Sequence, residues 1–250
     1  MRVFQHAIQK RFGVAVVSAL IVLAMSITAP AAIIPLSGGD SDNGWVAPAP
    51  SLLKFAYNLA DVDRTIQSVL FDEWANPGVA APTNPAGIVV TATANGTNPY
   101  GAPSYPLPTA NDTAMAEMIR NIFYSTANSG AGPLTFTMSN LTPNALYRID
   151  LFTYSGDLTR TNNYSYNGNS PDGATWIQTA GVSYLVQNTI AANGSGQIIL
   201  NISIPNPTAS NLNPILSGMA VSLVPEPSAI VLIGLGAAIT VVRGRRRLSK

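Results

Sequence analysis

The acidic side chains of the central chain offer few combinations that could do chemistry. Asp61, Asp63, Asp72 and Glu73 form its densest group of carboxylates. Hydrolysis of a glycosidic bond needs two carboxylates about 5–10 Å apart across a groove, one of them with a raised pKa. Nothing in the sequence places two acids in that way, and the three tryptophans are scattered. We therefore expect charges at strand ends and in loops, with a carboxylate-dependent glycan-cleaving enzyme as the alternative.

A second group of acids has the spacing of a cation-binding loop. Asp40-Ser-Asp42-Asn43-Gly44 alternates oxygen-bearing side chains before a glycine, as loops that hold hard cations do. It lacks the bidentate glutamate that ends an EF-hand loop. We expect a flexible, solvated segment and keep structural calcium as a hypothesis. No other metal or cofactor is expected.

Cysteine is absent, and the only histidine is His6, close to the N-terminus. Without a thiol or an imidazole in the central chain, Ser-His-Asp and Cys-His nucleophilic catalysis are excluded, as are the usual zinc sites. Together with the scattered acids, this predicts no catalytic residues and a protein that is not an enzyme.

The N-terminus has the pattern of a secretory signal peptide. Arg2, Lys10 and Arg11 precede an apolar stretch over residues 14–27, and Ala29-Pro30-Ala31 offers small residues to signal peptidase. An apolar helix of this length rises ~21 Å against a hydrocarbon core of ~30 Å, too little for a stable anchor. We expect cleavage after Ala31; an uncleaved N-terminal anchor is the alternative.

The C-terminus has a pattern of its own, in which a short acidic motif, an apolar run and a basic cluster follow one another. Pro225, Glu226 and Pro227 lead into an apolar run over residues 228–242, which is followed by a basic cluster. The cluster consists of Arg243, Arg245, Arg246 and Arg247. Basic residues beyond an apolar helix remain in the cytoplasm. The run therefore predicts a transmembrane helix over residues 228–242, with Pro-Glu-Pro at the outer interface.

This order resembles the PEP-CTERM sorting signal of bacterial exported proteins. The resemblance implies recognition and cutting by a membrane enzyme of the exosortase type, so that the C-terminus anchors the chain only transiently. It also implies delivery to the cell surface or extracellular matrix of a Gram-negative-type bacterium. Plain C-terminal anchoring is the alternative, although two prolines and a carboxylate would add nothing to an anchor.

Between the two ends the charge changes sign. Residues 32–224 hold five basic and eleven acidic side chains, a net charge of −6, whereas the whole chain is +1. Nucleic acids need a basic footprint on the proteins that bind them, so nucleic acid is excluded as a partner.

Short β-branched and aromatic stretches alternate with turn residues through this central part. Strands are predicted over 52–59, 68–74, 88–93, 134–138, 145–154, 175–179, 182–190, 197–204 and 215–223. Such regular spacing predicts a mainly β fold, an antiparallel jelly-roll-like β-sandwich. Residues 112–123 differ, because Met115, Met118 and Ile119 have helical spacing behind a capping Asp112 or Thr113. We expect one short helix there.

Four segments follow from these patterns. They are a signal peptide over 1–31, a flexible linker over 32–50, a β-sandwich ectodomain over 51–224 and a sorting tail over 225–250.

Residues 138–156 resemble a turn and strand common in exported β-sandwiches, and residues 216–221 are similar to the last strand of galactose-binding-like modules. In such modules an arginine–carboxylate pair beside an aromatic ring often holds sugar hydroxyls, and Arg148 and Asp150 share one face of a predicted strand. The resemblance implies a glycan-binding rim made of Tyr154, Arg160, Tyr164 and Trp176. A surface salt bridge with ordinary loop tyrosines is the alternative.

The sequence as a whole favours a non-enzymatic surface or matrix protein that associates with polysaccharide. A self-associating structural protein of the matrix remains a second hypothesis.

Overall fold

The computed structural model describes residues 31–36, 45–60, 62–99, 107, 109–125, 132–156, 158–169, 175–205 and 213–225. The chain divides into two units, one of them Ala29–Val224 and the other Met1–Thr28 with Pro225–Lys250. Apart from Pro225, every described residue belongs to the first unit. The predicted signal peptide, apart from Ala31, and the predicted transmembrane helix fall outside the described residues. No helix within those ranges is both long and apolar enough to cross a bilayer.

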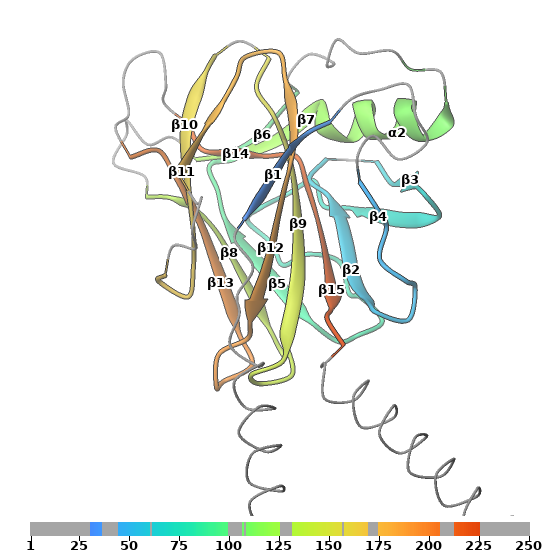
Figure 1. Cartoon of the computed structure of the whole chain (residues 1–250), viewed down its shortest axis with the longest axis vertical. Helices are drawn as coiled ribbons and strands as arrows, with labels where there is room; N and C mark the ends of the chain where they lie inside the picture. Colours follow the sequence, from blue (N-terminus) through green and yellow to red (C-terminus); the bar gives the residue numbers. More distant parts are fainter. Residues whose placement is uncertain are drawn as a thin grey trace, which may run out of the picture. The chain divides into compact units, whose positions relative to one another are not determined.

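Three β-sheets and one helix make up the described fold (Figure 1). The seven-stranded sheet has the order β1 (Ala32–Pro35), β12 (Ser183–Ala191), β9 (Leu146–Tyr154), β15 (Gly218–Leu223), β2 (Leu53–Asn58), β4 (Val69–Glu73) and β3 (Arg64–Ile66). The five-stranded sheet has the order β11 (Thr175–Gln178), β10 (Arg160–Tyr166), β13 (Ile198–Ser203), β8 (Leu134–Ser139) and β5 (Val89–Thr93). The small sheet has the order β14 (Ile215–Leu216), β7 (Asn121–Tyr124) and β6 (Gly96–Pro99). The helix is α2 (Ala110–Ile119).

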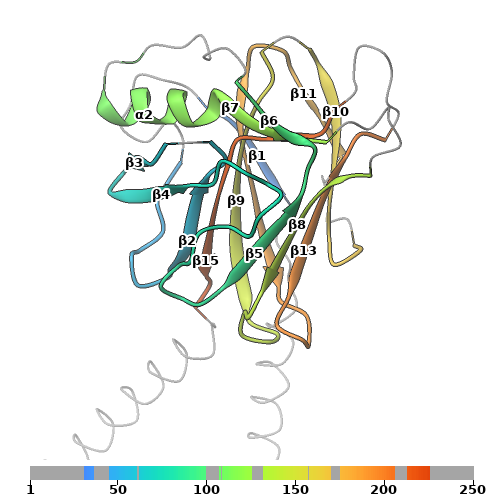
Figure 2. The ribbon, with the colours of Figure 1, turned by 180° about the vertical axis from the view of Figure 1, so that it is seen from behind.

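These elements confirm the predicted mainly β, jelly-roll-like sandwich with one short helix. The strand neighbours are antiparallel except for β2 and β4, which pair in parallel through Tyr57 with Asp72 and Asn58 with Glu73. The two larger sheets lie face to face, with β5, β8 and β13 toward the viewer in Figure 2.

Strict alternation of side chains builds a core between the two larger sheets, which we call the inner core. Tyr147, Ile149 and Leu151 enter it from β9. Leu134, Phe136 and Met138 enter it from β8 on the opposite sheet. Because successive side chains of a strand point to opposite faces, one apolar set per strand is enough to fill this layer. Burying each large apolar side chain contributes about 1.5–3 kcal/mol before entropy is subtracted.

A second core lies on the other face of the seven-stranded sheet, and we call it the outer core. Trp45, Phe71 and Phe152 meet there edge to face, with ring centroids 5.4–5.6 Å apart. Met115 and Met118 of α2 cover the same face and are fully buried. The seven-stranded sheet therefore buries apolar side chains on both faces, unlike an antiparallel sheet with one solvated side.

Helix α2 begins earlier and ends earlier than the sequence predicts. Thr109 is its N-cap and Asp112 is the third residue of a capping box, in which each side chain accepts a hydrogen bond from the other residue's backbone N–H. The predicted apolar face of Met115, Met118 and Ile119 is confirmed as buried. Phe123 is instead in β7 and enters the inner core, so pairing with β6 and β14 overrides the helical spacing after Ile119.

The described part of the segment predicted to be a flexible linker is folded. β1 pairs with β12 over four residues at the edge of the seven-stranded sheet. Trp45 is fully buried in the outer core, and Gln67 holds its backbone carbonyl with a hydrogen bond of 2.6 Å. The linker prediction is wrong for these residues. The apolar side chains of β1 and the indole of Trp45 pack against the sheet, and this burial stabilises an ordered chain over a solvated one.

Candidate functional site

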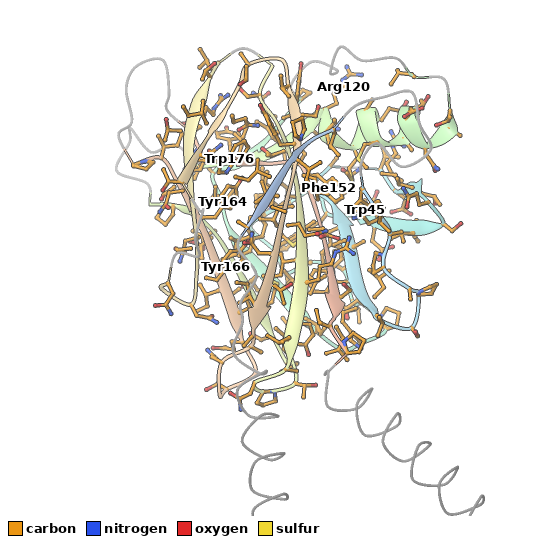
Figure 3. The ribbon with its side chains drawn as sticks, in the orientation of Figure 1. Trp45, Arg120, Phe152, Tyr164, Tyr166 and Trp176 are labelled. Atoms are coloured by element: carbon orange, nitrogen blue, oxygen red, sulfur yellow. The ribbon has the colours of Figure 1, made fainter. Side chains whose placement is uncertain are left out.

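The four residues predicted to form a glycan-binding rim are buried. Tyr164 is 1% exposed and Trp176 is 8% exposed. The rings of Tyr164 and Trp176, both labelled in Figure 3, stack in the inner core with centroids 6.2 Å apart. Trp176 also meets Tyr184 edge to face. Arg160 is buried and donates hydrogen bonds to Ser155 and to the carbonyl of Leu158.

Tyr154 lies in the outer core, across the sheet from Tyr164. The structure thus brings Tyr164 and Trp176 together but does not join the four residues in one surface site. The rim prediction fails because every second residue of β10 points inward, which places Arg160 and Tyr164 between the sheets.

Polar side chains connect the sheets in this part of the interior. Asn162 donates to Gln178 at 2.9 Å, and Gln178 donates to the Thr153 hydroxyl at 3.1 Å. Asn188 donates to the Tyr166 hydroxyl at 2.8 Å. Burial raises the pKa of the Tyr166 phenol well above its ordinary value of about 10, and burial also raises the pKa of Tyr164. These contacts fix the register of facing strands and leave the tyrosines neutral.

Arg148 and Asp150 do form the predicted ion pair, but Asp150 is inside the protein. Arg148 Nε lies 2.9 Å from Asp150 Oδ1, and Arg148 Nη2 lies 2.7 Å from Oδ2. Trp45 Nε1 donates to Oδ2 at 2.9 Å, and Gln187 Nε2 donates to Oδ1 at 2.8 Å. With four donors on two oxygens, the carboxylate has no capacity left for a sugar, so this cluster is structural.

The described members of the acidic group lie around β3 and β4. Asp63 Oδ1 accepts a hydrogen bond of 2.8 Å from the backbone N–H of Glu73. Partial burial raises the pKa of the Asp72 carboxyl, and the charge of Asp63 adds to that effect. Asp61 falls outside the described residues, as do Asp40 and Asp42 of the calcium hypothesis. Within the ranges that the structure describes, acids do not gather in threes as a metal site would require.

A surface hollow of about 400 Å³ lies where four segments of the chain meet. Its lining is Ala60, Ala75, Thr97, Asn98, Pro99 and Asn121. Ala60 follows β2, and Ala75 follows β4. Thr97, Asn98 and Pro99 belong to β6, and Asn121 is the first residue of β7. None of the six is ionisable, and the two asparagine amides and the threonine hydroxyl can both donate and accept hydrogen bonds. The hollow suits a neutral polar ligand and lacks the groups for acid–base chemistry.

The sequence alone does not reveal this hollow, because its lining comes from four separate segments. Trp45 is different: a tryptophan in an otherwise polar segment is a signal that the segment is buried. Gln187 carries no comparable signal in the sequence.

The sorting tail begins directly at the last strand of the seven-stranded sheet. The backbone N–H of Val224 donates to the carbonyl of Leu146 at 2.9 Å, and Pro225 follows. Glu226, Pro227 and the arginines 243, 245, 246 and 247 lie outside the described residues. Residues 223–247 match the PEP-CTERM protein-sorting motif. The chain carries a PEP-CTERM sorting signal.

PEP-CTERM motifs are generally recognised by exosortase, a membrane enzyme, and they direct export and sorting to the surface or extracellular space. Among curated proteins, none matches this chain.

Solved structures share its fold at low sequence identity. The ANX1 ectodomain from Arabidopsis thaliana has a TM-score of 0.51 and 13% identity, with 70% of this chain and 51% of that chain covered. The ANX2 ectodomain from the same plant has a TM-score of 0.51 and 12% identity, with 70% and 52% covered. This chain therefore spans about half the length of these ectodomains, and identities this low show a common β-sandwich fold alone.

Proposed function

We propose that this PEP-CTERM protein is a non-enzymatic component of the bacterial cell surface or extracellular matrix and that it associates with polysaccharide. The sorting motif over residues 223–247 is the observation that carries the proposal. It gives the destination, and the central part of the chain is then cargo that acts outside the cytoplasm.

The uncharged hollow supports binding rather than catalysis. Thr97, Asn98 and Asn121 offer hydroxyl and amide groups at one surface, as recognition of sugar hydroxyls requires. Glycoside hydrolysis would need a pair of carboxylates in the same place. The buried Asp150 is already held by Arg148 and two further donors, Trp45 and Gln187, so it is a poor candidate for such a role.

The intact mass of the protein from the native bacterium tests the export and sorting part. We expect loss of residues 1–31 to signal peptidase and loss of residues beyond about 225 to exosortase. In a strain without exosortase, the tail should remain and the protein should stay in the membrane fraction. A full-length mass in both strains would contradict the proposal.

Affinity electrophoresis in gels that contain a polysaccharide tests the binding part, and release of reducing sugar ends from the same polymers tests for catalysis. We expect retarded migration without release of new ends. Release of new ends would favour the glycan-cleaving alternative. Stable oligomers with no retardation in any polymer would favour a self-associating structural protein instead.

A further inference from the structure

The outward side chains of the five-stranded sheet carry no charge. Burial alternates strictly along its strands, so the residues that do not enter the inner core form one face, which we call the threonine-rich face. It consists of Val89, Thr91, Thr93, Thr135, Thr137, Ser139, Thr161, Asn163, Ser165, Thr175, Ile177, Ile199, Asn201 and Ser203. All but the three aliphatic residues are hydroxyl or amide side chains.

Charge is instead concentrated in the seven-stranded sheet. Lys54 lies in β2, Arg64 in β3 and Glu73 in β4. Arg160 is the single charged residue in the strands of the five-stranded sheet, and it is buried on the inner side. Soluble domains ordinarily mix charges of both signs over their surfaces and place lysine on edge strands. The neutral face is therefore a local property of one sheet.

The strand register arranges these groups in rows. Ser165, Asn201, Thr135 and Thr93 lie opposite one another across four strands. Thr135 Oγ1 donates to Asn201 Oδ1 at 2.7 Å within this row. In the neighbouring row across β11 and β10, Thr175 Oγ1 donates to Asn163 Oδ1 at 3.0 Å. Hydrogen bonds between side chains hold them in place before a ligand arrives, which lowers the entropy cost of binding.

The chemistry of the face restricts its partner. Nucleic acids and anionic polymers need basic residues, and the face has none. Cores of protein interfaces are enriched in aromatic residues, methionine and arginine, which are also absent from the face as described. Hydroxyl and amide groups can donate and accept hydrogen bonds, and the methyl groups of threonine pack against apolar surfaces. A neutral polymer rich in hydroxyls matches that combination.

We propose that the threonine-rich face binds an extended, neutral polysaccharide. The inference rests on the proposed function and gives it a location and a polymer class. The five strands lie about 4.8 Å apart, and each strand rises about 3.3 Å per residue. The face therefore measures roughly 20 Å in each direction, which is enough for several sugar rings in a row. The face then binds along the length of a polysaccharide rather than at its end.

The test compares variants of the full chain, purified in a mild detergent, by affinity electrophoresis. Hydroxyethyl cellulose and galactomannan serve as neutral probes, and alginate and dextran sulfate serve as anionic probes. Thr137→Glu places a charge in the middle of the face, and Thr137→Val removes only the hydroxyl. Thr65→Glu is the matched control, because Thr65 is an exposed strand residue of the seven-stranded sheet. Asn98→Ala changes the uncharged hollow.

We expect the wild type to bind a neutral probe and to ignore both anionic probes. Thr137→Glu should weaken binding about tenfold or more, because a charge would be desolvated against the polymer. Thr137→Val should weaken it less, and Thr65→Glu should leave it unchanged. Asn98→Ala should weaken it less than Thr137→Glu does, because the hollow offers only a few polar groups. Thermal melting curves establish that the variants fold. If Thr137→Glu does not fold, the comparison of Thr137→Val with wild type decides.

Other results would overturn the inference in distinguishable ways. Loss of binding in Asn98→Ala with full binding in Thr137→Glu would move the site to the hollow and leave the proposed function intact. No binding of wild type to any probe would contradict the polysaccharide part of the proposed function as well. A wild-type oligomer that Thr137→Glu dissociates, without polysaccharide binding, would make a second copy of the chain the partner.

Discussion

Asp150 lies at the centre of a polar cluster that joins parts of the chain far apart in sequence. Its oxygens accept hydrogen bonds from Trp45, Arg148 and Gln187, and Arg148 also donates to the carbonyl of Val46 at 2.6 Å. The cluster fastens the segment before β2 to the middle of the seven-stranded sheet. A buried carboxylate is tolerated because each of its lone pairs is satisfied.

Removing the Asp150 carboxylate should destabilise the folded protein. Asp150→Ala leaves the Arg148 guanidinium and the Trp45 N–H without their acceptor, so we expect a loss of about 3 kcal/mol in the free energy of unfolding. Urea denaturation followed by circular dichroism measures it. Glu117→Ala is the control, since the 3.1 Å pair of Glu117 with Arg64 is partly exposed and should contribute less than about 1 kcal/mol. Equal losses would contradict the structural role of Asp150.

The buried tyrosines predict sensitivity to alkali. Burial raises the pKa of Tyr57, Tyr164 and Tyr166 in the folded state above the ordinary value of about 10. The folded protein therefore holds protons that the unfolded chain loses, so stability is complete below pH about 10 and falls as the pH rises further. We expect these tyrosines to ionise only as the protein unfolds, which phenolate absorbance recorded together with circular dichroism will show.

Tyr164→Phe serves as the matched variant for this titration. Among the described residues, the Tyr164 hydroxyl has no hydrogen-bond partner, so its removal should leave stability at neutral pH unchanged or slightly higher. One late-ionising group should disappear. Ionisation of all nine tyrosines near pH 10 with the fold intact would show that the interior is open to solvent.

At the scale of elements, two turn glycines have similar backbones and different surroundings. Gly196 and Gly181 have φ angles of +70° and +77°. A Cβ on Gly196 would lie 2.3 Å from the carbonyl oxygen of Leu141, whereas a Cβ on Gly181 would meet nothing within 4 Å. Only the first turn therefore needs glycine for space as well as for conformation.

Substitution of these two glycines separates the cost of backbone strain from the cost of steric overlap. Gly181→Ala should destabilise the protein by about 1 kcal/mol because of its left-handed backbone. Gly196→Ala should cost about 3 kcal/mol, since the Leu141 carbonyl must also move. Melting temperatures and urea midpoints of the two variants measure the difference. Equal effects would mean that the Leu141 turn yields freely.

The strands that the sequence predicts correctly are those with clear apolar alternation, such as β8 and β9. β10 was missed because its inward residues include Arg160 and Asn162, which interrupt the apolar pattern. Hydrogen bonds to Gln178 and Ser155 make those polar residues acceptable in the interior, and neither partner can be identified from local sequence. The sharing of a face by Arg148 and Asp150 was predictable, but the donors Trp45 and Gln187 were not, because they reach Asp150 only through tertiary structure.

At the scale of the whole molecule, the seven-stranded sheet is shared by two cores. Phe136 is fully buried in the inner core and Phe71 in the outer core. Because strands such as β9 contribute to both, loss of either core should remove support from the other. We expect the two cores to unfold in one cooperative transition.

Truncation of either phenylalanine tests this. Phe136→Ala and Phe71→Ala should each lower the free energy of unfolding by about 3–5 kcal/mol and keep a single transition. Tryptophan fluorescence reports on both cores, since Trp45 lies in the outer core and Trp74 and Trp176 lie in the inner core. Two separate transitions in fluorescence and circular dichroism would show that the cores are independent.

β15 has a consequence for the order in which the protein folds. It is the last strand along the described part of the chain, yet it lies between β9 and β2 and pairs with both. The two halves of the seven-stranded sheet therefore cannot join until residues 218–223 are available. Contacts between residues so distant along the chain slow folding. In an exported chain this order keeps the seven-stranded sheet incomplete until its last described strand is available.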